Sequence, residues 1–238
     1  MTPAELLYAL AAVGANVLGA LAVTSHAKWS LRALDVLLSV AAGFLISVSL
    51  IDLFPDALAR NGARGAEVAL AAYVLVHLTQ HVLGRHFHFG EETHEVSQLV
   101  GMSALVGLLM HTFVDGVAMA SALRVSATLG GLVFVAVLLH KFPEGLAISS
   151  LFLAAGSGRG RAILAALALG LTTVLGLLLS DRIDFLREYG LAVSAGVTLY
   201  VGASNLVPEF QAKRLWRLPA AFVGGCAMYV AARALLPV

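Results

Sequence analysis

Two short segments of the chain carry the same polar pattern inside long apolar runs. They read HTFVDG and HKFPEG, and each places a histidine four residues before a carboxylate that is followed by a glycine. In a helix, residues i and i+4 project from the same face, one turn apart. The spacing therefore predicts two local imidazole–carboxylate pairs, His111 with Asp115 and His140 with Glu144.

These four side chains suit the coordination of a metal ion. Two neutral imidazoles and two carboxylates form a ligand set for a divalent transition metal, zinc above all. Two carboxylates in a low-dielectric interior are costly unless cations or protons join them. If the helices that carry the two segments face each other, the four groups converge. Gly116 and Gly145, which follow the carboxylates, would let neighbouring helices approach closely.

The composition is that of an integral membrane protein. Of the 238 residues, 60% are hydrophobic and 12% are charged, whereas soluble domains carry about a quarter charged residues. The mean hydropathy is +0.91. A net charge of +1 excludes a strongly basic nucleic-acid binder. The single Cys226 excludes an intrachain disulfide framework and a cysteine-based zinc finger.

Long apolar runs define the expected fold. A membrane-spanning helix needs roughly 20 apolar residues. The runs are continuous and not alternating, which favours helices over barrel strands. We therefore expect an all-α membrane protein with one domain over residues 1–238, because the breaks between the runs are short. Eight spans are predicted, over residues 4–25, 34–54, 65–84, 97–122, 127–152, 160–181, 188–208 and 216–236.

The sequence contains two internal repeats. The histidine–carboxylate segment occurs in the fourth and fifth predicted helices, and residues 42–56 align without gaps on residues 195–209 in the second and seventh. Both pairs join helices that cross the membrane in opposite directions. The chain thus reads as a 3+2+3 arrangement with inverted repeats, helices 1–3 being related to 6–8 and helix 4 to helix 5. Inverted repeats around a midplane site recur in transporters.

The two segments, the eight helices and the inverted symmetry resemble the ZIP family of zinc- and iron-regulated metal transporters. The fourth and fifth helices of that family carry signatures of this kind. The resemblance implies that His111, Asp115, His140 and Glu144 form the principal transport site. It also implies movement of a divalent metal toward the cytoplasm by an elevator-like shift of the helices that carry the site, and a homodimer as the assembly.

The metal in this interpretation is the transported ion and not a cofactor. The candidate ions are zinc, iron(II), manganese, cobalt and cadmium, and two histidines favour zinc over magnesium or calcium. The partners are then the divalent ion and the lipid bilayer.

Two positions depart from the family pattern. Thr112 stands where many members have asparagine, and Lys141 where many have a carboxylate. Both neighbouring positions help to form a second metal site in two-metal members. Because a charged lysine does not bind a metal ion, our hypothesis is a single-metal site with Lys141 as a built-in counter-charge. Alternatively, Lys141 snorkels to the membrane surface or pairs with a carboxylate such as Glu144.

Further polar residues are candidates for the transport pathway. Asp52 and its repeat mate Asn205 precede prolines in the second and seventh spans. Asp52 either gathers cations at the outer mouth or is an interfacial charge at a helix end. His86, His88 and His94 lie in the polar stretch between the third and fourth spans, which resembles a short version of the family's histidine-rich loop. They would bind exiting metal weakly, or they belong to an ordinary polar loop.

The charges of the loops favour one orientation, with both termini extracytoplasmic. This orientation gives the cytoplasmic loops eight positive residues and the outer side six. The cytoplasmic set is Lys28, Arg32, Arg85, Arg159, Arg161, Lys213, Arg214 and Arg217. The outer set is Arg60, Arg64, Arg124, Arg182, Arg187 and Arg233. Short loops and the lack of a targeting segment favour a prokaryotic cell membrane. In a prokaryote with two membranes, this is the inner one.

Three other functions could use intramembrane histidines or carboxylates. An intramembrane metalloprotease would carry H-E-x-x-H, but lysine follows His140 here, so we expect no enzyme. A haem protein could use two intramembrane histidines but would not explain Asp115 and Glu144. A proton-coupled carrier of another solute is the strongest rival, because histidine and carboxylate chains also relay protons.

Overall fold

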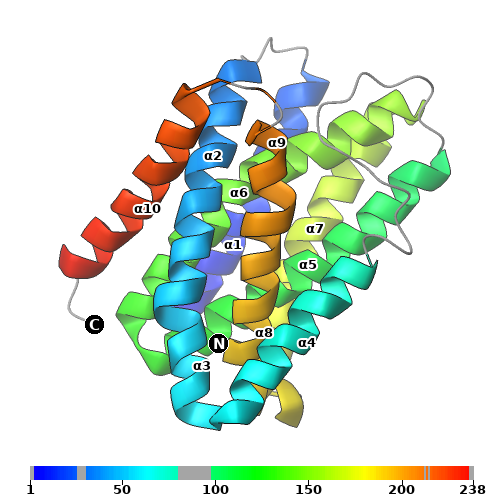
Figure 1. Ribbon diagram of the computed structural model, residues 1–238. Coiled ribbons are helices and arrows are strands. Elements are labelled where there is room, and N and C mark those ends of the chain that lie inside the picture. Colours follow the sequence, from blue (N-terminus) through cyan, green and yellow to red (C-terminus); the bar gives the residue numbers. More distant parts are fainter. Residues whose placement is uncertain (1–2, 26–30, 80–97, 212, 214, 236–238) are drawn as a thin grey trace.

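The computed structural model describes residues 3–25, 31–79, 98–211, 213 and 215–235. In this part of the chain all regular structure is helical, and it forms eight rods (Figure 1). The rods are α1 (Pro3–Thr24), α2 (Leu31–Val48) continued by η1 (Ser49–Leu53) and α3 (Phe54–Asn61), α4 (Ala63–Leu78), α5 (Gln98–Val125), α6 (Ala127–Ala154), α7 (Arg159–Leu179), α8 (Asp184–Tyr200) continued by η3 (Val201–Leu206) and α9 (Val207–Gln211), and α10 (Arg217–Leu235).

The eight rods match the eight predicted runs in number and order. Among the described helices, six are long and apolar enough to cross a membrane. The other two rods contain α4 and α8, which have 16 and 17 residues of regular α-helix. At 1.5 Å per residue α4 spans about 24 Å, less than the roughly 30 Å of a bilayer core. The rod that contains α8 is lengthened by η3 and α9.

The prolines at 55 and 208 do not end their helices, as the predicted spans 34–54 and 188–208 assumed. Each lies in the first turn after a π-helical segment. In η1 the Phe54 N–H donates to the Ser49 carbonyl, and in η3 the Val207 N–H donates to the Gly202 carbonyl. A proline is tolerated in a first helical turn because its missing N–H has no intrahelical partner there. The rod that begins at Leu31 therefore continues past Pro55 to Asn61.

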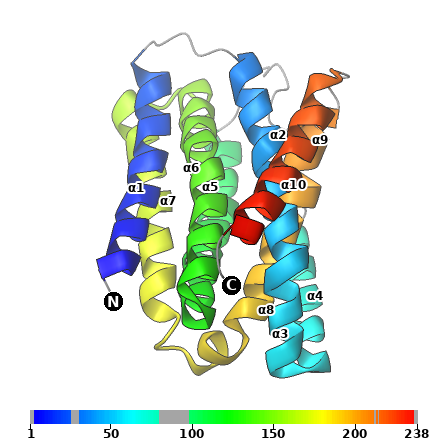
Figure 2. The same cartoon turned by 90° about the vertical axis from the view of Figure 1, so that its left-hand side faces the viewer.

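The rods pack as two groups of four (Figures 1 and 2). One group, here named bundle A, contains α1, α5, α6 and α7. The other, bundle B, contains α2–α3, α4, α8–α9 and α10. Figure 2 shows them as two halves of the molecule, with bundle A on the side of the N-terminus. The helices of each group contact one another more extensively than they contact the other group.

Glycines allow the helix backbones to touch inside each bundle. A Cβ atom added to any of these glycines would collide with backbone atoms of the neighbouring helix, so only glycine permits the approach. In bundle A the contacts are Gly145 on Asn16, Gly19 on Phe142, Gly116 on Thr173 and Gly176 on Phe113. In bundle B they are Gly43 on Phe222, Gly225 on Val40 and Gly196 on Ala69. The expectation that Gly116 and Gly145 bring helices together is confirmed.

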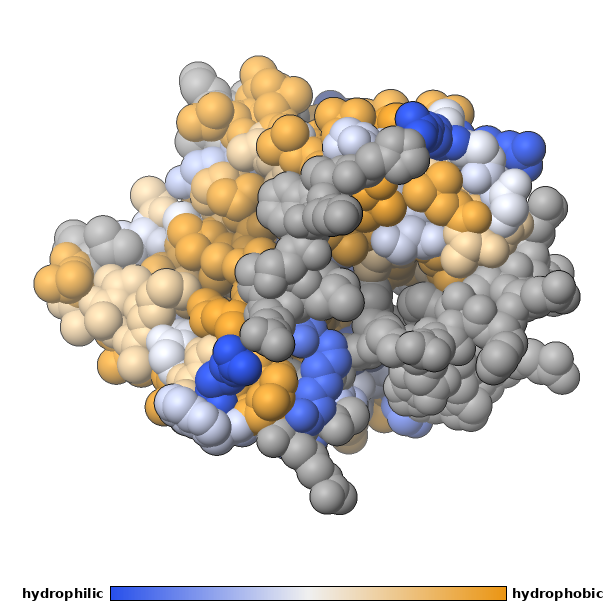
Figure 3. Space-filling model, turned by 90° about the horizontal axis from the view of Figure 1, so that it is seen from above, coloured by the Kyte–Doolittle hydropathy of each residue, from blue (hydrophilic) through white to orange (hydrophobic). Residues whose placement is uncertain are grey.

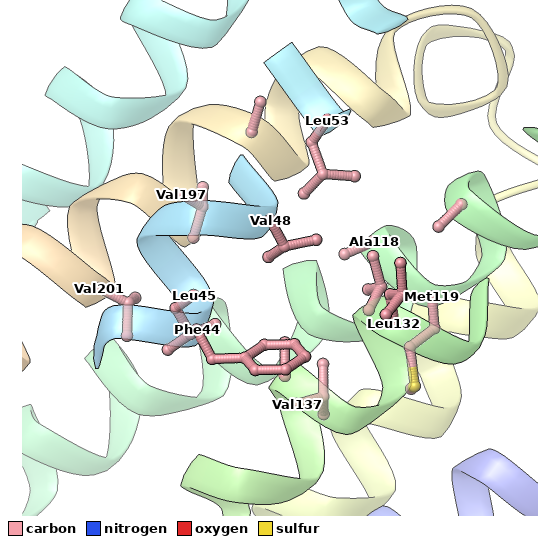
Figure 4. Packing of buried hydrophobic residues seen from close by; sticks show 14 of the residues in the cluster. Phe44, Leu45, Val48, Leu53, Ala118, Met119, Leu132, Val137, Val197 and Val201 are labelled. Carbon is pink, nitrogen blue, oxygen red and sulfur yellow. The ribbon is translucent and has the colours of Figure 1, made fainter. Parts of the chain in front are cut away.

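The two bundles meet through apolar side chains. Figure 4 shows this contact, where side chains of α2, η1, α8 and η3 face side chains of α5 and α6. Bundle B contributes Phe44, Leu45, Val48, Leu53, Val197 and Val201, and bundle A contributes Ala118, Met119, Leu132 and Val137. We name these ten residues the interbundle cluster. Its side chains consist of hydrocarbon and one thioether, so they form no ion pairs with one another.

The outer surface of the bundles is apolar as well. Large exposed hydrophobic side chains lie on most rods, for example Leu7 on α1, Leu70 on α4 and Leu164 on α7. Figure 3, which looks down on one end, shows apolar residues around much of the described surface, with hydrophilic residues in small groups. Such a surface is expected where lipid chains surround a protein.

Candidate metal site

The site lies between α5 and α6 in bundle A, and one residue fixes their register. Ser126 alone separates the two helices, and its hydroxyl accepts a hydrogen bond from the Leu129 N–H at 3.0 Å, which caps α6. His111 lies 14 residues before the end of α5 and His140 lies 13 residues after the start of α6. The antiparallel helices therefore carry the two histidines at the same height.

The four predicted ligands come together. His111, Asp115, His140 and Glu144 are each 4–6% exposed. Each offers one ligand atom, and these atoms all lie within 4.8 Å of one another. Two opposed helices thus present two imidazoles and two carboxylates to one point in the protein interior. The convergence predicted from the spacing is confirmed.

A single oxygen, Oδ2 of Asp115, is the centre of this arrangement. It lies 3.4 Å from His111 Nε2 and 3.2 Å from His140 Nε2. The contact with His111 is the predicted i,i+4 pair within α5. The contact with His140 crosses from α5 to α6.

The backbone fixes the orientation of His140. Its Nδ1 lies 2.8 Å from the Ala136 carbonyl oxygen, which can only accept, so Nδ1 carries the proton. In a neutral imidazole this leaves a lone pair on Nε2, the atom that faces Asp115. Metal-binding histidines are commonly held in this way by a carbonyl on the opposite ring nitrogen.

Two polar atoms of these four side chains have no hydrogen-bond partner among the described residues. His111 Nδ1 and Glu144 Oε1 are buried and make no hydrogen bond there. An unpaired buried polar atom costs about 1–3 kcal/mol. Groups left unsatisfied in this way need an explanation, and a metal ion that binds them is one.

A comparison with known protein families identifies the chain. The model of the ZIP zinc transporter family matches residues 79–232, more than half of the sequence and both histidine–carboxylate segments. The chain belongs to the ZIP zinc transporter family. None of the curated proteins compared matches the chain. Members of the ZIP family transport divalent metals and are not enzymes, and the chain is a multi-pass membrane protein.

Lys141 is the most unusual residue of this ZIP site. Its side chain is 0% exposed, so it does not snorkel to a membrane surface. Its Nζ lies 2.6 Å from Asp115 Oδ2 and 2.8 Å from Glu144 Oε2. These are the distances of charge-assisted hydrogen bonds. The alternative in which Lys141 pairs with Glu144 is thus confirmed. The sequence also predicted a local pair of Glu144 with His140, whose Nε2 instead reaches across to Asp115.

The other position that departs from the ZIP pattern also lies at the site. Thr112 is fully buried, and its hydroxyl donates to the Leu109 carbonyl of the preceding turn at 3.0 Å. A hydroxyl in that bond is a weaker metal ligand than the amide oxygen of asparagine.

Asn16 is a residue of the site region that sequence reasoning missed. It lies on α1, is 0% exposed, and is the only amide in an otherwise apolar run. With its amide turned to satisfy both neighbours, it donates to the Lys141 carbonyl at 2.6 Å and accepts from the Gly170 N–H at 3.3 Å. An isolated asparagine in a membrane span was the available signal.

The predicted pathway residues lie outside the cluster, in the two π-helical segments. Asp52 in η1 is 6% exposed, and its carboxylate accepts hydrogen bonds from Arg233 Nε at 2.8 and 3.2 Å. Arg233 lies near the end of α10 and was not foreseen as its partner. Asn205 in η3 is partly buried beside Ser204, whose hydroxyl lies 2.7 Å from that of Tyr73. The predicted loop ligands His86, His88 and His94 fall outside the described residues.

Proposed function

We propose that this protein carries a divalent transition metal, zinc by preference, across the membrane toward the cytoplasm. The transport site is His111, Asp115, His140 and Glu144. The metal is the transported substrate, and the set of two imidazoles and two carboxylates favours zinc, iron(II), manganese, cobalt or cadmium over magnesium or calcium.

One observation carries the proposal. Four ligand atoms from two opposed helices lie within 4.8 Å of one another in the protein interior, and two buried polar atoms of the same side chains have no hydrogen-bond partner among the described residues. A cluster of polar side chains inside a membrane is costly and marks an ion pathway. Burial together with unfilled bonding capacity is what a site for a desolvated cation requires.

The test measures binding and transport with the same variants. Purified protein is expected to bind zinc with one ion per chain, and replacing His111 and His140 together by alanine is expected to abolish binding. Proteoliposomes with the wild type are expected to take up zinc, and the double variant is not. His77 on α4 lies outside the cluster, so His77→Ala is the matched control. A cation panel would rank the metals.

The same experiment separates the rival function. A proton-coupled carrier of another solute would use the four residues as a proton relay. It would bind no stoichiometric zinc, and its solute flux would not depend on zinc. Zinc binding that survives loss of both histidines would overturn our proposal.

Three geometric correspondences support the inverted 3+2+3 repeat as part of this proposal. The π-type hydrogen bonds of Phe54 to Ser49 and of Val207 to Gly202 fall at aligned positions of the repeat. The aligned glycines 43 and 196 contact α10 and α4, which are the eighth and third rods and hence repeat mates. Gly116 and Gly145 end the two histidine–carboxylate segments of the central helices. They contact α7 and α1, which are the sixth and first rods and hence also repeat mates.

The arrangement of contacts supports an elevator-like motion. Backbone-to-backbone glycine contacts tie the helices within each bundle. Between the bundles, the interbundle cluster offers smooth hydrocarbon surfaces without directional bonds. Bundle A can then move as one body, with the site inside it, along bundle B.

The positive charges of the loops support one orientation in the membrane. We place both termini outside the cytoplasm, in a prokaryotic cell membrane. Asp52 then lies toward the outer side and Asn205 toward the inner side, as pathway residues. His86, His88 and His94 would receive the exiting metal on the cytoplasmic side. A homodimer is the assembly that family resemblance implies.

Lys141 makes this a single-metal site in our proposal. Its ammonium contacts both carboxylates of the cluster, and it supplies the positive charge that a second cation supplies in two-metal members of the family. It supplies one positive charge to a site that carries two negative ones.

A further inference from the structure

We propose that Lys141 alternates with the transported metal as the cation of the site, and so allows the unloaded carrier to return without a bound co-ion. The inference rests on the proposed function and adds a role in the transport cycle. It goes beyond the counter-charge assignment, because it predicts which step of the cycle slows when the lysine is lost.

The first step of the argument is that Lys141 and the metal compete for the same oxygens. Lys141 Nζ lies 2.6 Å from Asp115 Oδ2, the oxygen that both histidines also face, and 2.8 Å from Glu144 Oε2. A metal ion bound by Asp115 and Glu144 would have to approach these oxygens to about 2.0–2.2 Å. A divalent ion on Asp115 Oδ2 would repel the ammonium that lies 2.6 Å from the same oxygen, so we infer that metal binding pushes the lysine side chain away.

The second step is the charge that bundle A carries in each half of the cycle. With neutral imidazoles and Lys141 charged, the unloaded site has one net negative charge, and the site loaded with a divalent ion has one net positive charge. Without the lysine, the unloaded site has two negative charges and the loaded site none. The cost of placing a charge in a low-dielectric medium grows as the square of that charge. With Lys141, the electrostatic cost of moving the site is therefore equal for the loaded and the unloaded carrier.

The third step is kinetic. A carrier cycles at the rate of its slower movement, so an unloaded bundle with two uncompensated carboxylates would limit net uptake. Exchange of metal for metal avoids that movement, because the carrier returns loaded. Loss of the lysine charge should therefore slow net uptake much more than exchange. A purely structural role of Lys141 would lower both rates together.

The experiment compares the two fluxes in proteoliposomes held at zero membrane potential. Net uptake is measured as zinc entering zinc-free vesicles, and exchange as labelled zinc entering vesicles loaded with unlabelled zinc. In the wild type the two rates are expected to be similar. Lys141→Gln keeps hydrogen-bonding capacity but removes the charge, and it is expected to raise the exchange-to-net ratio by about tenfold or more. It is also expected to bind zinc more tightly.

Lys213→Met is the matched control. Lys213 also pairs with a carboxylate, Asp35 at 2.5 Å, but it lies at the end of bundle B and not at the site. Its ratio is expected to equal that of the wild type. Lys141→Arg, which keeps the charge, is expected to restore the ratio toward that of the wild type.

Each outcome decides the inference. A wild-type ratio far above one would overturn it without any variant, which covers the case in which Lys141→Gln does not fold. An unchanged ratio in folded Lys141→Gln would overturn it too. If wild-type vesicles neither bind nor transport zinc, the proposed function fails. If they transport zinc and only the ratio behaves otherwise, the role of Lys141 alone fails.

Discussion

Gly145 on α6 lies directly against Asn16 on α1, so closely that a methyl group on Gly145 would collide with the Asn16 carbonyl. The residue before it, Glu144, is a predicted metal ligand, and Asn16 also reaches the Lys141 carbonyl. The contact therefore positions the segment of α6 that carries the site and ties it to its neighbour.

Gly145→Ala should consequently destabilise the protein. The clash is with backbone atoms, which cannot turn aside as a flexible side chain can. Overpacking of this kind costs about 1–3 kcal/mol. Thermal unfolding in detergent measures the loss. Gly224→Ala is the matched control, because nothing lies within 4 Å of a Cβ at that position, and it should unfold like the wild type. Equal behaviour of the two variants would contradict the close contact.

Zinc should stabilise the folded protein through the four-residue cluster. A ligand that binds only the native state adds about 2.7 kcal/mol when its concentration is 100 times its Kd. The wild-type melting temperature should therefore rise with zinc and fall again when a chelator removes it. The His111→Ala/His140→Ala double variant should show no rise. A similar rise in both proteins would mean that zinc binds elsewhere.

Reversing the charge at position 141 should change the number of bound ions. Lys141→Glu replaces the ammonium by a third carboxylate beside Asp115 and Glu144. Three adjacent anions require further cations, so we expect two metal ions per chain in place of one. Metal content after dialysis, measured by mass spectrometry, tests this. An unchanged stoichiometry would count against Lys141 as the counter-charge of the site.

The ion pair between Asp52 and Arg233 should contribute to stability across the end of bundle B. Arg233→Gln would leave the buried Asp52 carboxylate without its charged donor, which should lower the free energy of unfolding by about 1–3 kcal/mol. Asp52→Asn in the same background removes the unpaired charge and should recover part of the loss. If the double variant is no more stable than Arg233→Gln alone, the carboxylate is not the source of the cost.

The histidine–carboxylate segments allowed the cluster to be predicted from the sequence. The helical period alone places His111 and Asp115 on one face, and likewise His140 and Glu144. The predicted spans 97–122 and 127–152 then place the two segments near the middle of the membrane in helices that run in opposite directions. Local periodicity and the length of a span are properties of the chain itself, whereas only the structure shows that the two helices face each other and that the four groups converge.

Tertiary packing decided which groups pair within the site. Sequence spacing favoured His140 with Glu144 and allowed Lys141 with Glu144 as an alternative, and the structure has the second pair within α6. Lys141 Nζ and His140 Nε2 also reach across to Asp115, and these two contacts depend on how α5 and α6 are rotated about their axes. That rotation is set by the glycine contacts of α5 with α7 and of α6 with α1, which join residues far apart in the chain, such as Gly116 with Thr173 and Gly145 with Asn16.

The partner of Asp52 was likewise invisible in the sequence. Residue 52 and residue 233 are 181 positions apart, and no periodicity links them. Their meeting requires α10 to pack along α2, which Gly43 and Gly225 permit. The sequence by itself thus determined the helices, the ligand types and the family. Only the packed bundles decided the ion pairs that cross between helices, Lys141 with Asp115 and Arg233 with Asp52, because these depend on distances between helices and not on spacing along one.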